Sequence, residues 1–206
     1  MAFRIALTFD AEHPDRSAAS GNAERLLASL DRLALRATFF VQGRWAEACP
    51  ATARRIFEAG HLIGSHSHYH APMPLLSDEG LADDLESARA AILEHTGADP
   101  RPWFRCPFGA GGEDRGLIAR VERLGYREVG WDVNPEDWQP TNSDVDVEDA
   151  VVSGVLARGD GAVVLLHTWP DQTSTALPRI VDALRRRGAD FIAVDELARL
   201  PTTHPG

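Results

Sequence analysis

The chain has 206 residues, which is enough for one domain with a hydrophobic core and short for two, so we expect a single domain over residues 1–206. Apolar residues make up 44% of the chain and charged residues 25%, and no apolar run is long enough to cross a membrane. The formal net charge of -10 argues against nucleic acid as a partner, because proteins that bind phosphates usually concentrate Lys and Arg.

Strand-like and helix-like segments alternate along the chain. Short runs rich in apolar, β-branched or aromatic residues predict strands at residues 3–9, 37–41, 61–65, 103–105, 126–131, 162–167 and 190–194. Apolar residues at a helical period predict helices at residues 22–33, 51–59, 78–95, 114–124, 147–157 and 177–187. This order predicts an α/β fold, a distorted (β/α)7-type barrel of parallel strands with surrounding helices, and a doubly wound open sheet is the alternative.

Polar residues that can do chemistry stand where the predicted strands end. They are Asp10 and Glu12 after the first strand, His66 and His70 after the third, Arg105 with the fourth, Asp137 and Trp138 after the fifth, and His167 at the end of the sixth. In parallel α/β folds the carboxyl ends of all strands point to one side, where active sites form. We therefore expect these five segments to meet on one face.

The histidines His66 and His70 stand four residues apart, a spacing that zinc sites use. Zinc in hydrolases is commonly held by two His and one carboxylate, with a further position left for water. By itself the pair is a weak signal, since two surface histidines can simply be solvated. Its setting beside other acid and base candidates favours a metal site, with Asp10 or Glu12 as the carboxylate ligand.

Five motifs, in order, resemble those of the polysaccharide deacetylases, also called carbohydrate esterase family four. They are Thr8-Phe9-Asp10, His66-Ser67-His68-Tyr69-His70, Arg105-Cys106-Pro107-Phe108-Gly109, Trp131 through Asp137-Trp138, and Leu165-Leu166-His167. Together they extend from residue 8 to residue 167. A chance match of five ordered motifs over so much of the chain is very improbable.

The resemblance implies hydrolysis of a carbon–nitrogen amide bond, most often the N-acetyl group of an amino sugar, by water that a metal ion activates. The implied metal is Zn²⁺, with Co²⁺ or another divalent ion as a substitute. Asp10 would be the base that takes a proton from the water, and His167 the acid that protonates the departing nitrogen. An amide nitrogen leaves poorly unless it is protonated, and such assistance is worth on the order of 10² to 10⁴ in rate.

The same resemblance implies roles for the residues around this pair. Arg105 would orient Asp10, and Asp137 would hold His167 in the correct tautomer. The backbone N–H of Phe108 would stabilise the negative oxygen of the tetrahedral intermediate. Two further residues, Trp138 and Leu165, would line the substrate groove against the acyl methyl group.

One position departs from the family pattern. The usual first motif is Asp-Asp-Gly, in which the second Asp binds the metal, but this chain has Ala11 there. Glu12 is one methylene longer than Asp and follows directly, so we predict Glu12, His66 and His70 as the metal ligands. If Asp10 were the ligand instead, the base would be unassigned. Asn134 is a smaller departure, at a position where the family often has Asp.

Two other functions remain open at this point. The first is a small-molecule amidohydrolase resembling an allantoinase or an imidase, and the second is a non-catalytic carbohydrate-binding relative. The expected partner is an N-acetylated carbohydrate or a small amide, with no membrane partner. The N-terminus lacks the features of a secretory signal, which predicts a cytoplasmic location, and Cys49 and Cys106 are expected to be reduced. His68 is expected to face solvent.

Overall fold

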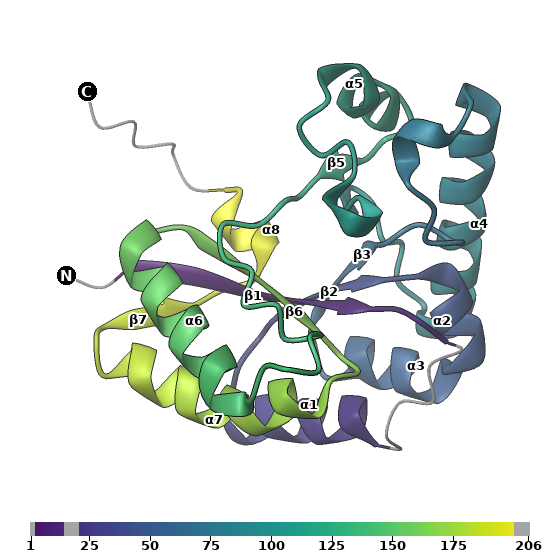
Figure 1. The fold of residues 1–206 in the computed structure, drawn as a ribbon. Helices are drawn as coiled ribbons and strands as arrows, with labels where there is room; N and C mark the ends of the chain where they lie inside the picture. Colours follow the sequence, from purple (N-terminus) through teal and green to yellow (C-terminus); the bar gives the residue numbers. More distant parts are fainter. Residues whose placement is uncertain (1–2, 15–20, 200–206) are drawn as a thin grey trace.

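A parallel sheet, curled into a half-barrel and surrounded by helices, forms the centre of the molecule in a computed structural model that describes residues 3–14 and 21–199 (Figure 1). The strands are β1 Phe3–Ala11, β2 Thr38–Val41, β3 Leu62–Ser65, β4 Trp103–Phe104, β5 Arg127–Glu128, β6 Ala162–His167 and β7 Ala189–Phe191. Their order is β5-β4-β3-β2-β1-β6, and β7 pairs with β1. The predicted distorted (β/α)7 barrel is confirmed.

The helices cover the outside of the sheet. They are α1 Asn22–Arg32, α2 Gly43–Ala48, α3 Pro50–Glu58, α4 Asp78–Thr96, α5 Arg115–Arg123, α6 Asp144–Arg158, α7 Asp171–Arg185 and α8 Val194–Leu197, with 3-10 turns η1 Met73–Leu75 and η2 Pro107–Gly109. All six predicted helices are present, and α7 begins six residues earlier than predicted. Among the described residues, no helix is both long and apolar enough to span a membrane.

The end of the chain differs from the prediction of a strand over residues 190–194. Strand β7 ends at Phe191, and α8 begins at Val194. The backbone N–H of Val194 donates to the hydroxyl of Thr38 at 3.1 Å, and acidic Asp195 and Glu196 occupy the first turn of α8. Acidic side chains are favourable at a helix N-terminus, so these residues form a helix rather than a longer strand.

Strand β1 lies in the middle of the sheet and runs two residues further than predicted, through Asp10 and Ala11. Alternate residues of a strand point to opposite faces. Ile5, Leu7, Phe9 and Ala11 accordingly belong to the buried apolar cluster between the sheet and the helices. The other face carries Thr8 and Asp10, which accept hydrogen bonds from the buried guanidinium of Arg105 inside the barrel. Glu12 follows on the same side and lines the cavity.

At the seam of the half-barrel, a single bridge and a buried side chain hold the segment that follows β5. Beyond the short β5, the chain crosses toward β6, where Val133 bridges Val164. The fully buried Arg105 donates to the carbonyls of Val129 at 3.0 Å and Gly130 at 3.1 Å. These carbonyls bond to a side chain instead of a neighbouring strand, which explains why β5 is shorter than the predicted segment 126–131.

Candidate active site

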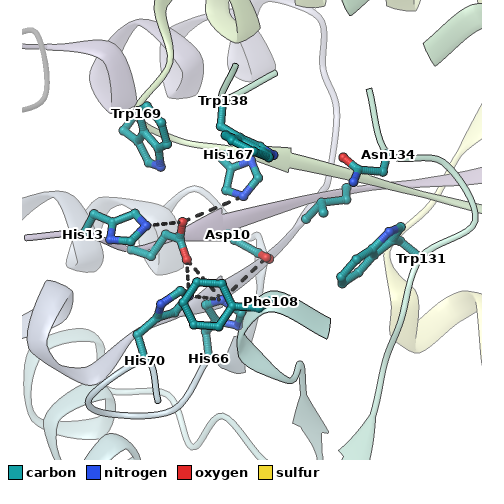
Figure 2. Close-up of a pocket in the computed structure, with 12 residues that line it drawn as sticks. Asp10, His13, His66, His70, Phe108, Trp131, Asn134, Trp138, His167 and Trp169 are labelled. Carbon is teal, nitrogen blue, oxygen red and sulfur yellow. Dashed lines mark hydrogen bonds and ion pairs between the residues drawn. The ribbon is translucent and has the colours of Figure 1, made fainter. Parts of the chain in front are cut away.

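The carboxyl ends of the strands open onto a cavity of about 330 Å³ (Figure 2). The predicted site residues that line it are Asp10, Glu12, His66, His70, Phe108, Trp138, Leu165 and His167. The two others, Arg105 and Asp137, are fully buried behind this lining. His13, Trp131, Asn134 and Trp169 also line the cavity. The five segments expected to converge on one face therefore do so.

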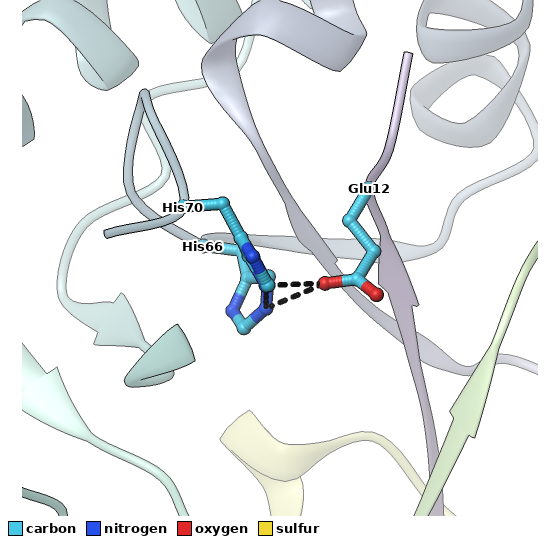
Figure 3. A group of neighbouring side chains, drawn as sticks. All are labelled: Glu12, His66 and His70. Carbon is cyan, nitrogen blue, oxygen red and sulfur yellow. Dashed lines mark hydrogen bonds and ion pairs between the residues drawn. The ribbon is translucent and has the colours of Figure 1, made fainter. Parts of the chain in front are cut away.

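The three predicted metal ligands form one cluster (Figure 3). Glu12 Oε2 lies 3.3 Å from His66 Nε2 and 2.5 Å from His70 Nε2, and the two imidazole nitrogens are 3.2 Å apart. Tetrahedral ligands at bond lengths of about 2.0–2.1 Å stand about 3.3 Å from one another. Two of the three separations already match this value, so the donor set fits a small divalent cation such as zinc.

The second nitrogen of His66 shows which atom faces the cluster. Nδ1 lies 3.0 Å from the carbonyl of Arg105, which can only accept a hydrogen bond, so Nδ1 carries the proton and Nε2 is free to bind a cation.

The three ligands also affect one another's ionisation. Burial opposes a charge on His66, but Asp10 and Glu12 raise its pKa. Burial lowers the pKa of His70. Burial also works against ionisation of Glu12, yet three surrounding imidazoles lower its pKa well below the usual range.

The loop after β3 is a tight turn that places both imidazoles on one side. Ser67 and His70 have φ values of 61° and 58°, in the left-handed region. The hydroxyl of Ser67 accepts from the backbone N–H of His70 at 2.8 Å. The carboxylate of Asp84 on α4 accepts from the backbone N–H groups of His68 and Tyr69 at 3.0 and 3.1 Å. These bonds offset the cost of the left-handed residues, which is of order 1–3 kcal/mol each.

The expectation that His68 faces solvent is wrong. Its side chain is buried, because Asp84 ties the loop back onto the helices. The imidazole lies directly against Gly43, where a Cβ atom would come within 2.3 Å of Nδ1. Glycine is therefore required at the start of α2 for the loop to close in this way.

The proposed base and acid are direct neighbours in the sheet. Asp10 on β1 and His167 on β6 are register partners, so their side chains leave the sheet side by side. Arg105 donates from Nη1 to Asp10 Oδ1 at 2.9 Å and to the hydroxyl of Thr8 at 2.8 Å. The guanidinium also lies over the ring of Phe40, with 4.2 Å from Cζ to the ring centroid. Asp10 is thus held from behind by a buried cation.

Asp137 holds His167 through both of its oxygens. Oδ1 lies 2.7 Å from His167 Nδ1, and Oδ2 accepts from the backbone N–H of the same residue at 2.8 Å. A carboxylate accepts, so Nδ1 carries a proton and Nε2 is left to face the cavity. Burial opposes a charge on His167, but Asp137, with help from Asp10 and Glu12, raises its pKa to about 9.

Two further residues at the site, Thr173 and Gln42, were not predicted from the sequence. The hydroxyl of Thr173, in the first turns of α7, donates to Asp137 Oδ2 at 2.6 Å. Gln42 precedes α2 and accepts from the backbone N–H of His13 at 3.1 Å, while its Nε2 donates to the carbonyl of His68 at 3.2 Å. Both residues follow closely after a predicted strand, which is the signal that could have singled them out.

The apolar residues predicted to contact substrate lie at the mouth and on the wall of the cavity. Phe108 is 66% exposed and Trp138 38%, whereas Leu165 is only 4% exposed. Phe108 has a φ of 58° within η2 and contacts the ring of His70, with 4.4 Å between the centroids. The cavity therefore has an apolar rim next to the ionisable groups.

Known proteins are similar to this chain in both sequence and fold. A sequence model of the family described as polysaccharide deacetylase matches residues 2–129, which contain the first three motifs. The peptidoglycan-N-acetylglucosamine deacetylase PgdA of Listeria monocytogenes is 32% identical over 194 residues, covering 94% of this chain and 38% of that protein. The chitooligosaccharide deacetylase of Bradyrhizobium is 30% identical over 176 residues, covering 78% of this chain and 77% of that protein.

The fold agrees with a solved member of the same family. The family 4 carbohydrate esterase from Streptomyces lividans, in complex with acetate, superposes with a TM-score of 0.78 at 32% identity, covering 91% of this chain and 90% of that chain. This chain spans about two fifths of the Listeria protein and most of the Streptomyces structure. The chain belongs to the polysaccharide deacetylase family.

Proposed function

We propose that the protein is a metal-dependent N-deacetylase that removes the acetyl group from an N-acetylated amino sugar in a glycan, with zinc as its metal. The main support is the position of the Glu12, His66 and His70 cluster beside the register pair Asp10 and His167. A metal site and an acid–base pair that open into one cavity together provide the groups that metal-assisted hydrolysis of an amide by water uses.

The chain's own residues provide the proton transfers of this reaction. A cation held by Glu12, His66 and His70 would supply Lewis acidity and lower the pKa of water at the site. Asp10 takes a proton from the attacking water as the new carbon–oxygen bond forms. The carbon–nitrogen bond then breaks while His167 donates the proton on Nε2 to the nitrogen. The products are acetate and a free amine, and Asp137 keeps His167 protonated and oriented until that step.

The apolar part of the cavity matches the acyl end of such a substrate. Leu165 lies on the wall and Trp138 at the rim, so a methyl group can be buried there while the amide carbonyl reaches the polar groups. The backbone N–H of Phe108 is proposed as the donor to the negative oxygen of the intermediate. Exposed Phe108 and Trp138 offer flat faces on which a sugar ring can stack.

The test is acetate release by the zinc-loaded protein from N-acetylglucosamine oligosaccharides and from peptidoglycan. We expect turnover of at least one of them, and we expect Asp10→Asn to lower kcat on the order of 10² to 10⁴ while zinc binding is retained. Stoichiometric zinc binding without acetate release would contradict the proposal. Hydrolysis of cyclic ureides in place of the glycans would instead favour a small-molecule amidohydrolase.

A further inference from the structure

The two carboxylate oxygens of Glu12 have different partners. Oε2 faces His66 and His70 (Figure 3), whereas Oε1 accepts from His13 Nε2 at 2.9 Å. His167 is the next nearest imidazole to Oε1, at 3.8 Å, which is too long for a hydrogen bond. Glu12 is only 4% exposed, so solvent has little access to replace His13 as a partner.

A glutamate ligand needs such a partner more than an aspartate does. Its side chain has one further rotatable bond, and ordering a long side chain costs up to about 2 kcal/mol in lost rotamer freedom. A carboxylate can also bind a cation through one oxygen or two. A donor on Oε1 removes part of this freedom before any cation arrives and leaves Oε2 directed at the imidazoles.

His13 is itself fixed by the neighbouring segments. Its backbone N–H donates to Gln42 Oε1, and the same amide group donates from Nε2 to the carbonyl of His68, in the loop that holds the histidine ligands. The imidazole of His13 lies edge-on to His70, with 5.0 Å between centroids, and to Trp169, with 6.1 Å. Gln42 thus connects the segment that carries Glu12 to the loop that carries His66 and His70.

We propose that His13 is a positioning residue for the metal site, which holds Glu12 as a one-oxygen ligand through Oε2. This inference rests on the proposed metal-dependent function. It explains how Glu12 can take over from the ligand that Ala11 does not supply, since the longer side chain comes with its own anchor. In this chain, the Asp-x-Glu form of the first motif therefore depends on His13 as the hydrogen-bond partner of Glu12.

Three substitutions at residue 13 separate the hydrogen bond from packing and backbone strain. His13→Phe keeps a ring against His70 and Trp169 but has no donor. His13→Asn suits the left-handed φ of 59° at this position, yet its side chain is too short to reach Oε1. His13→Gln carries an N–H at nearly the same distance from the backbone as the imidazole Nε2. His95→Gln, in the last turn of α4, controls for the removal of a histidine elsewhere.

The measurement is the zinc dissociation constant by competition with a chromophoric chelator, together with the melting temperature of the metal-free protein. We expect zinc binding to weaken about 10- to 100-fold in the Phe and Asn variants, as for other partners of metal ligands. The Gln variant and the His95 control should stay close to the wild type. Because Asn suits the left-handed backbone, the Asn variant should keep the melting temperature of the wild type even if the Phe variant folds poorly.

The outcomes distinguish this inference from the proposed function. Wild-type zinc affinity in both the Phe and Asn variants would overturn the role of His13 and leave the metal-dependent function standing. The same weakening in the Gln variant would also overturn it, because the loss would then not follow the N–H donor. A wild-type protein without affinity for zinc would overturn the proposed function and this inference with it.

Discussion

The two halves of the site are built in different ways. The acid–base half, Asp10 and His167, stands on adjacent strands in register, and each side chain is held by a buried charged group. The metal half takes its imidazoles from a loop with left-handed residues and its carboxylate, Glu12, from the position after β1. The register between two strands fixes which residues are neighbours, whereas a loop or a strand end can supply a ligand from a different position. The departure from the family's first motif, at Ala11, lies at such a strand end.

Glu12→Ala should have the largest effect, and it acts on the metal half of the site. Removal of the only carboxylate in the cluster leaves two imidazoles, and we expect loss of stoichiometric zinc binding and of acetate release together. Zinc titration and an acetate assay on one preparation measure both, with Glu47→Ala on the exposed side of α2 as the control. Retained zinc binding with lost activity would assign Glu12 to the acid–base half instead.

Arg105→Met should destabilise the protein at the acid–base half of the site, where Arg105 is the buried cation beside Asp10. It removes the charged partner of Asp10 and the donors to two carbonyls at the barrel seam. Loss of one partner from a buried pair costs about 3 to 5 kcal/mol, so the free energy of unfolding should fall by that amount. Urea unfolding of the metal-free protein measures it. A loss of about 1 kcal/mol or less, as for an exposed ion pair, would contradict the prediction.

Asp137→Asn should act on the pH dependence while zinc binding is unchanged. The pKa of His167 is raised to about 9, so the imidazole stays protonated below that pH and activity falls as the pH rises through it. Without the carboxylate the pKa should return toward about 6.5, which lowers kcat at pH 8 by about 10- to 100-fold and moves the alkaline limb to lower pH. A pH–rate profile that keeps its alkaline limb would argue that another group is the acid.

The same raised pKa has a consequence for stability. A group whose pKa is higher in the folded state contributes stability that is complete below its unfolded pKa of about 6.5 and is lost as the pH rises through about 9. The difference in free energy of unfolding between the wild type and Asp137→Asn should therefore be larger at pH 6 than at pH 10.

Thr173→Val should produce the smallest effect. It removes one of the donors to Asp137 and leaves the bond to His167 Nδ1. A hydrogen bond to a charged group is worth about 1.5 to 3 kcal/mol at most, so we expect a modest loss of stability and only a small shift of the alkaline limb. Thr175→Val is the matched control, because the hydroxyl of Thr175 donates to a carbonyl within α7. Equal effects of the two variants would contradict a specific role for Thr173.

Features with a local pattern could be predicted from the sequence. The strand–helix alternation and the polar residues at strand ends follow from short apolar runs and their periodicity. Helices α2 and α8 could not, because six and four residues are too few to display a helical period. The partners Thr173 and Asp137 are 36 residues apart, and Gln42 and His13 are 29 apart, so these contacts depend on how the segments pack in three dimensions.

The alternation of β1 sets a limit on how its motif can change. Ala11→Asp looks like a return to the family's Asp-Asp sequence, yet residue 11 lies on the face that packs with Leu7 and Phe9 in the apolar cluster. In this chain that substitution would bury a carboxylate away from the cavity, not restore a ligand. The first motif is thus defined here by the face of the strand on which a carboxylate lies.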